Sequence, residues 1–242
     1  LSKTIAGKVK LEDAGFDWKV LGPDVGDVDY VAWQCDQDAY AAIGQKCSAQ
    51  SILFMHNNWH KHDLLAKMKK QVERRSLKDL TIGPVLTWNN TQIEEHISKL
   101  LELDGAKVLW GGKRLTGHNI PERYGSFEPT AVYVPIKHFT TKKKLKLVTN
   151  ELFGPFQVIT DYKTSTLKKV FNTLDSMEHH LTAAVVSNDS DFLTEMLSNT
   201  VNGTTYAGRR ARTTGAPQNH WFGPAGDPRG AGIGTKEAIQ LV

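Results

Sequence analysis

The stretch VDYVAWQCDQDAYAAIGQKCSAQSILFM, residues 28–55, contains a helical pattern, a glycine turn and a strand pattern in direct succession. Apolar residues recur with helical spacing from Val31 onward, after Asp27 as a candidate N-cap and before Gly44 as a stop. The apolar run at residues 51–55 then predicts a strand. A helix that leads at once into a strand is typical of an α/β domain.

The same alternation continues through most of the chain, which favours an α/β fold over a helical bundle or an all-β sandwich. Thr91 and Glu94 predict a capping box for the third helix. Residues 202–234 show no periodicity, and a loop of this length in a compact domain is usually functional. Further helices are predicted at residues 60–75, 91–103, 145–150, 165–174 and 192–198, and further strands at residues 82–86, 107–110, 130–134, 156–160 and 183–187.

Composition narrows the class of protein. The chain has 242 residues, of which 40% are hydrophobic and 23% charged, so it can form one large domain or two small ones. Its 30 Lys and Arg against 26 Asp and Glu are too evenly balanced to indicate nucleic acid binding. No apolar run approaches the roughly 20 residues of a membrane-spanning helix, so we expect no membrane partner. The two cysteines, Cys35 and Cys47, cannot form a disulfide framework and favour a reducing compartment.

Cys47 is a candidate nucleophile. It follows the Gly44 stop and precedes a predicted strand, where a side chain can be exposed at a turn. Lys46 or nearby backbone amides could stabilise its thiolate. The alternative is a buried, inert thiol, because free cysteine is among the most buried residue types. Cys35, on the apolar face of the preceding helix, fits that alternative well.

Two carboxylates stand beside turn residues. Glu12 lies close to Gly15 and could act as a general base if it is desolvated, although most glutamates are simply solvated. Glu151 and Phe153 point to the same side if their segment is extended. A carboxylate can accept hydrogen bonds from vicinal hydroxyls while a ring packs on a flat cofactor. The alternative for this pair is a plain turn before a strand.

The histidines do not indicate a metal site. His60 and His62 are predicted to face apart on a surface helix, and His179 and His180 have no further ligand nearby. We therefore expect no metal. The lysine run at residues 142–146 is predicted to be a solvated face.

Taken together, the segments around Glu12, Cys47 and Glu151 resemble the aldehyde dehydrogenase superfamily in their order and approximate spacing. More narrowly, residues 11–24, 44–50, 111–135 and 202–234 resemble plant-type delta-1-pyrroline-5-carboxylate dehydrogenases over essentially the whole chain. The motif Leu11-Glu12 continues Asp13-Ala14-Gly15 where the family usually has Leu-Gly-Gly, a departure that this branch shares. The motifs that carry the resemblance are Leu11-Glu12, Gly44-Gln45-x-Cys47 and Glu151-x-Phe153-Gly154-Pro155.

The resemblance implies a three-layer catalytic domain with a mixed, mostly parallel sheet flanked by helices. It also implies NAD-dependent oxidation of an aldehyde. If the matching residues have the roles they have in the family, Cys47 attacks the aldehyde carbon and its backbone N–H forms half of an oxyanion hole. Glu12 would then activate the water that hydrolyses the thioester. Glu151 would hold the hydroxyls of the nicotinamide ribose, and Phe153 would pack near the ring.

For the substrate, the resemblance implies L-glutamate γ-semialdehyde, which is oxidised to glutamate in proline catabolism in the mitochondrial matrix. Ser48 and the loop Gly223, Pro224, Ala225 and Gly226 would hold its distal carboxylate, since exposed backbone N–H groups can cup an anion. A structural turn is the alternative for this loop. The family also implies a homo-oligomer for the full-length enzyme.

The resemblance further implies that residues 1–242 form a catalytic domain alone. No glycine-rich turn for a dinucleotide is apparent, so we expect the Rossmann-like cofactor domain and the C-terminal oligomerisation segment to be absent and NAD binding by this chain to be poor. Three other interpretations stay open: another aldehyde substrate, a cysteine hydrolase that uses Cys47 with a histidine, and a noncatalytic binding or regulatory partner.

Overall fold

The structure is a computed structural model that describes residues 15–214. These residues form a seven-stranded sheet with the strand order β3-β4-β5-β2-β1-β6-β7. β3 is antiparallel to β4, and the other pairings are parallel. The strands are β1 (Asp17–Leu21), β2 (Gln50–His56), β3 (Lys107–Trp110), β4 (Thr130–Tyr133), β5 (Phe156–Tyr162), β6 (Thr182–Val186) and β7 (Thr204–Ala207).

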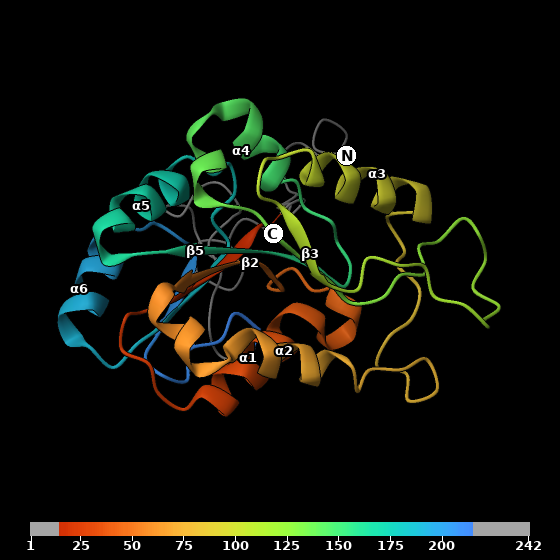
Figure 1. The fold of residues 1–242 in the computed structure, drawn as a ribbon, viewed down its shortest axis with the longest axis horizontal. Helices are drawn as coiled ribbons and strands as arrows, with labels where there is room; N and C mark the ends of the chain where they lie inside the picture. Colours follow the sequence, from red (N-terminus) through yellow and green to blue (C-terminus); the bar gives the residue numbers. More distant parts are fainter. Residues whose placement is uncertain (1–14, 215–242) are drawn as a thin grey trace, which may run out of the picture.

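Helices cover both faces of the sheet (Figure 1). The α-helices are α1 (Val28–Tyr40), α2 (Leu64–Val72), α3 (Asn90–Leu101), α4 (Lys142–Val148), α5 (Leu167–Asp175) and α6 (Ser190–Ser198). Short 3-10 turns are η1 (Ala41–Gly44), η2 (Asn57–His62), η3 (Ile136–Thr140) and η4 (Thr164–Thr166). The predicted α/β fold, with a mostly parallel sheet between two helical layers, is confirmed. Within residues 15–214, no helix combines the length and apolar character needed to cross a membrane.

Two apolar clusters hold the helices on the sheet. Side chains alternate between the faces of a strand, so Trp18 and Val20 pack beneath α3 to α6, whereas Leu21 packs with α1 and α2. Helix α1 contributes Cys35 and Ala39 to its cluster, as the helical spacing of the apolar residues predicts. The parallel sheet is buried on both faces, which is the usual state of such sheets.

Two strands, β1 and β7, were not predicted from the sequence. β1 carries Asp17 and Lys19 between its apolar residues, yet both charged side chains are buried. β7 lies at the sheet edge in a half-buried stretch, inside the region predicted as a long loop. β1 was missed because its buried charged residues resemble surface residues, and β7 was missed because its four half-buried or exposed residues carry no clear apolar alternation.

Three local predictions are wrong. Residues 82–86 do not form a strand, and Val85 makes only an isolated bridge to Gly125. The capping box of α3 consists of Asn89 and Gln92, because α3 begins one residue earlier than predicted. Residues 60–62 belong to η2, so α2 is shorter than predicted.

Candidate active site

Cys47 lies in a sharp turn between α1 and β2. Three successive residues of η1 have a positive φ: Ala42 at 53°, Ile43 at 63° and Gly44 at 64°. A positive φ is costly for a β-branched residue such as isoleucine, so this turn stores backbone strain. The chain then reaches Cys47, which is exposed, before β2 begins. The predicted exposure of Cys47 at a turn is confirmed.

The two thiols differ sharply. Cys35 is fully buried, and burial raises its pKa to about 11 despite the opposing effect of Lys19. Its thiolate is therefore scarce near neutral pH. Cys47 is the exposed cysteine of the pair and the stronger candidate nucleophile.

Gln45 stabilises the same turn through two side-chain hydrogen bonds. Its side-chain nitrogen donates to the carbonyl of Pro84 at 3.0 Å, and its side-chain oxygen accepts from the N–H of Leu86 at 2.9 Å. The segment predicted as a strand thus serves as a support for the cysteine turn. This role of Gln45 was not predicted, because nothing in the neighbouring sequence indicates it.

Glycines bring the three motifs together. A Cβ added to Gly44 would lie 2.1 Å from the carbonyl oxygen of Gly154, so these two backbones are in direct contact. A Cβ on Gly15 would lie 2.9 Å from the carbonyl oxygen of Cys47. The N–H of Gly15 also donates to Oε2 of Glu151 at 3.3 Å. The motif with the cysteine, the motif with Glu151 and the residue that follows the Glu12 motif therefore meet in one place.

The common location follows from the topology. Gly15 precedes β1, Cys47 precedes β2 and Glu151 precedes β5. These three strands are parallel neighbours in the sheet, so their amino ends lie at the same edge. Residues that precede adjacent parallel strands are thereby placed side by side.

The opposite edge of the sheet, where β1, β2 and β5 end, carries a cavity of about 240 Å³ lined in part by Pro23, His56 and Tyr162. Open α/β sheets commonly bind ligands at the carboxyl ends of their strands. Asp24 lies at this edge and accepts hydrogen bonds from Ser187, Asn188 and Arg209. Burial by itself would raise the pKa of Asp24, but these partners outweigh it and hold the pKa below its usual value. The amino edge is the candidate site because Gly15, Cys47 and Glu151 meet there.

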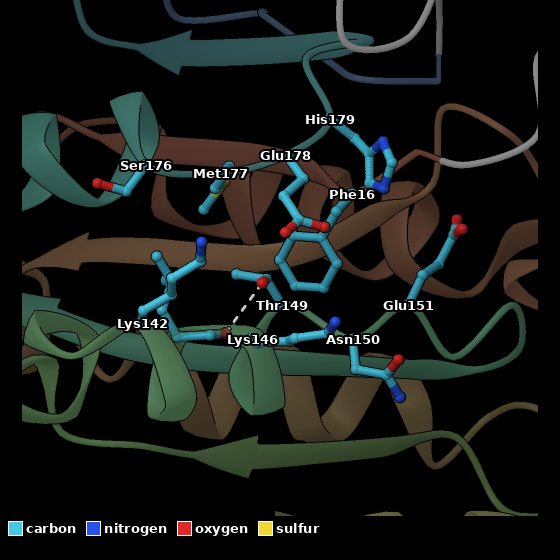
Figure 2. Close-up of a pocket in the computed structure, with 11 residues that line it drawn as sticks. Phe16, Lys142, Lys146, Thr149, Asn150, Glu151, Ser176, Met177, Glu178 and His179 are labelled. Carbon is cyan, nitrogen blue, oxygen red and sulfur yellow. Dashed lines mark hydrogen bonds between the residues drawn. The ribbon is translucent and has the colours of Figure 1, made fainter.

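A cavity of about 220 Å³ opens beside Glu151 at the amino edge. Figure 2 shows Phe16 from the segment before β1 in this cavity, with Glu178 and His179 from the segment before β6. Lys142 and Lys146 of α4 also line it. The predicted solvated face of the lysine run is confirmed by the exposure of its lysines. The other lining residues were not predicted as part of a site, although Glu178 and His179 stand before a predicted strand, as Cys47 does.

Glu151 and Phe153 alternate in burial with the residue between them. Both are half-buried and flank the buried Leu152, which is the alternation of an extended segment. Ser48, next to the cysteine, is also half-buried. Glu12 and the loop Gly223, Pro224, Ala225 and Gly226 lie outside the described residues.

The histidines are used in other ways. His60 lies 3.1 Å from a carboxylate oxygen of Asp161 in an exposed pair. In the part of the chain that the structure describes, no group of three or more His, Cys, Asp or Glu side chains could hold a metal ion.

Known proteins match this chain over almost its whole length. The sequence model of the Aldehyde dehydrogenase family matches residues 2–237. A probable aldehyde dehydrogenase of Linum usitatissimum is 64% identical over 242 residues, which is 100% of this chain and 44% of that protein. A mitochondrial delta-1-pyrroline-5-carboxylate dehydrogenase of Arabidopsis thaliana is 64% identical over 243 residues, with the same coverage. The chain thus spans under half the length of these relatives.

Solved structures show the same fold. A 1-pyrroline-5-carboxylate dehydrogenase from Thermus with bound NAD has a TM-score of 0.72 at 24% identity, over 95% of this chain and 42% of that one. An aldehyde dehydrogenase of Physcomitrella patens in complex with succinate has a TM-score of 0.73 at 19% identity, over 94% of this chain and 44% of that one.

Proposed function

Because the chain belongs to the aldehyde dehydrogenase family, we propose that the complete protein oxidises an aldehyde to an acid with NAD, and that Cys47 is its nucleophile. The observation that carries the proposal is the meeting of Cys47, Gly15 and the Glu151 segment at the amino edge of the sheet. The thiol of Cys47 is exposed, so a substrate carbonyl can reach it.

The chemistry assigned to Cys47 begins with addition of its thiolate to the aldehyde carbon, which forms a thiohemiacetal. The backbone N–H of Cys47 donates to the oxygen that becomes negative in this step. NAD, when bound, would supply the oxidation by accepting the hydride that leaves the carbon. What remains on Cys47 is a thioester.

Glu12 is the proposed general base for hydrolysis of that thioester. It takes a proton from water, the hydroxyl adds to the thioester carbon, and the thiolate of Cys47 leaves with the acid as product. Support comes from the chain itself, because Glu12 is close in sequence to Gly15, which contacts the carbonyl of Cys47.

The described residues fit one part of NAD. Glu151 is half-buried beside a cavity, and its carboxylate can accept two hydrogen bonds from the vicinal hydroxyls of a ribose. Phe153, which is half-buried two residues further along the chain, would pack near the nicotinamide ring. Residues 1–242 act as the catalytic domain in this proposal, with most contacts to NAD made elsewhere in the protein.

We further propose L-glutamate γ-semialdehyde as the substrate, in proline catabolism. The relative from Arabidopsis thaliana supports this, since it is named a delta-1-pyrroline-5-carboxylate dehydrogenase. Ser48 and the loop Gly223, Pro224, Ala225 and Gly226 would hold the distal carboxylate. The same relative is named mitochondrial, which supports a mitochondrial location, with the matrix as the proposed compartment. A homo-oligomer is proposed for the complete enzyme.

The test follows NADH absorbance with the complete protein, NAD and glutamate semialdehyde. Cys47→Ser is expected to reduce turnover by at least about a thousandfold, because the hydroxyl is a far weaker nucleophile than the thiolate. Cys35→Ser, which changes the buried thiol, is the matched control and should retain turnover if the variant folds. Full turnover in Cys47→Ser would refute the role of Cys47.

A further inference from the structure

Arg75 joins the end of α1 to the segment that follows α2. Its side chain is 8% exposed and pairs with Asp36 of α1, with Nε 3.1 Å from Oδ1 and Nη2 2.7 Å from Oδ2. Its Nη1 donates to the carbonyl of Tyr40, the last residue of α1, at 3.3 Å. The same atom donates to the carbonyl of Thr81 at 3.4 Å. One guanidinium thus binds the backbone of α1 and the backbone of the segment after α2.

The contact with Tyr40 lies where α1 ends and the turn that carries Cys47 (residues 41–47) begins. The last carbonyls of a helix have no partner within the helix, and this end of a helix attracts cations. The last turn of α1 contains no basic residue, so Arg75 supplies the cation from another element. The start of the turn is thereby held by a side chain from outside α1.

A second joint lies at the other end of the same turn. The side chain of Gln45 binds the carbonyl of Pro84 and the N–H of Leu86. Gln45 stands two residues before Cys47. The chain from Thr81 to Leu86 is therefore attached to the turn near both of its ends, by Arg75 at one end and by Gln45 at the other.

The two segments also touch between these joints. A Cβ added to Gly83 would lie 3.0 Å from Cδ1 of Ile43, the residue in the middle of the turn. Ile43 has a φ of 63°, which a β-branched residue keeps only when the surrounding structure holds it there. Residues 81–86 are the part of that surrounding structure to which Arg75 attaches the turn.

A small closed loop fixes Thr81 relative to Arg75. The N–H of Ser76 donates to Oγ1 of Thr81 at 2.7 Å, and the N–H of Thr81 donates to the carbonyl of Ser76 at 3.1 Å. Ser76 directly follows Arg75. The guanidinium therefore binds α1 from a segment whose own backbone is already closed.

We propose that Arg75 is a positioning residue for Cys47, which holds the start of its turn against residues 81–86. Stabilisation alone would not require this arrangement, because well-packed apolar side chains often serve as well as a buried ion pair. An apolar side chain could not bind both carbonyls. The thiol and N–H of Cys47 must stand correctly relative to the aldehyde carbon, and a displacement of about 1 Å can lower a rate on the order of a hundredfold. This inference rests on the proposed function, in which Cys47 is the nucleophile.

The test compares two neighbouring arginines in the complete protein. Arg75→Lys keeps the charge beside Asp36, but a single ammonium cannot reproduce the forked contacts with both carbonyls. Arg74→Lys is the matched control, because Arg74 is exposed and its described hydrogen bonds are with Gln71 alone.

Arg75→Lys is expected to lower kcat for glutamate semialdehyde about tenfold with KM within about twofold, since positioning acts on the reacting atoms. Arg74→Lys should equal the wild type. Turnover is counted per folded protein, so that a loss of folded enzyme does not imitate a loss of kcat. An unchanged kcat in Arg75→Lys, equal losses in both variants, or a change confined to KM would overturn the proposal.

Hydrogen exchange shows whether the effect is local. The N–H of Leu86 is bound by the side chain of Gln45, and the N–H of Gln45 by the carbonyl of Ala42 at 3.1 Å. Both amides should exchange at least about fivefold faster in Arg75→Lys while the amides of β2 stay protected. Unchanged exchange at both would contradict the positioning role. So would a loss of protection in β2, because Arg75 would then stabilise the whole domain.

The exchange measurement needs neither NAD nor an aldehyde, so it is independent of the proposed function. Full turnover in Cys47→Ser would refute the proposed function and, with it, the catalytic purpose of the turn, even where exchange shows that Arg75 holds it. Turnover that depends on Cys47 but not on Arg75, with unchanged exchange, would refute the positioning role alone.

Discussion

Two separate features of the structure require a glycine at position 44. Its φ is 64°, a conformation that side chains disfavour by roughly 1 kcal/mol. An added Cβ would also come within 2.1 Å of the carbonyl oxygen of Gly154, which is backbone and cannot swing aside. A substitution here must push apart the two loops that form the candidate site.

We expect Gly44→Ala to lower the free energy of unfolding by about 3 kcal/mol, as measured by denaturant titration. Gly117→Ala is the matched control, because Gly117 has a similar φ of 68° but nothing within 4 Å of an added Cβ. Its cost should be only the backbone cost of about 1 kcal/mol. Equal losses in the two variants would show that the contact with Gly154 is unimportant.

Helix α3 presents a buried histidine to the core. His96 packs against Trp88 and Phe156, and its Nε2 has no hydrogen-bond partner among the described residues. Burial, with a smaller contribution from Lys99, lowers its pKa from 6.5 to about 4. Between these two values the unfolded chain binds a proton that the folded protein does not bind, so the free energy of unfolding falls as the pH falls.

Replacement of this histidine should flatten that dependence. In His96→Leu, the loss of unfolding free energy between pH 7 and pH 4 is expected to be smaller than in the wild type by up to about 3 kcal/mol. Urea titrations at a series of pH values measure it. His56 and His180, whose pKa burial also lowers, are present in both proteins and largely cancel in the difference. Parallel profiles would show that His96 titrates normally in the folded state.

Across the whole molecule, one phenol joins a helix to three strands. The hydroxyl of Tyr40, at the end of α1, donates to the carbonyl of Thr130 in β4. It accepts from Nε1 of Trp110 in β3 and from Nε2 of Gln157 in β5, each at 2.9 Å. All of these groups are buried, and burial raises the pKa of Tyr40 well above its usual range.

We expect Tyr40→Phe to lower the free energy of unfolding by about 3 kcal/mol, because two buried donors and one carbonyl lose a partner. Tyr30→Phe, at an exposed tyrosine of the same helix, should cost less than about 0.5 kcal/mol. Thermal unfolding of both variants measures the difference. A loss in Tyr40→Phe as small as in the control would mean that water or a shift of Gln157 replaces the phenol.

The predictions from the sequence failed where a charged residue is buried against a partner that is distant in the sequence. β1 was missed because Asp17 and Lys19 resemble surface residues, whereas Asp17 accepts from the N–H of Thr182 and Lys19 pairs with Asp38. Both partners are remote in sequence, so no local pattern could indicate them. Among the predicted site residues, the exposure of Cys47 could be predicted from its place in a turn directly before a strand.

Local patterns were sufficient for the α/β class, most helices and strands, and the exposed turn that carries Cys47. These predictions succeeded because helices and strands place side chains with a fixed period, which is visible in residues close together in the sequence. Only the folded chain decides that β5, β2 and β1 are adjacent, which brings Gly154, Gly44 and Gly15 together. Strand order and the compensation of buried charge depend on contacts between residues far apart in sequence, and those contacts form only when the whole domain packs.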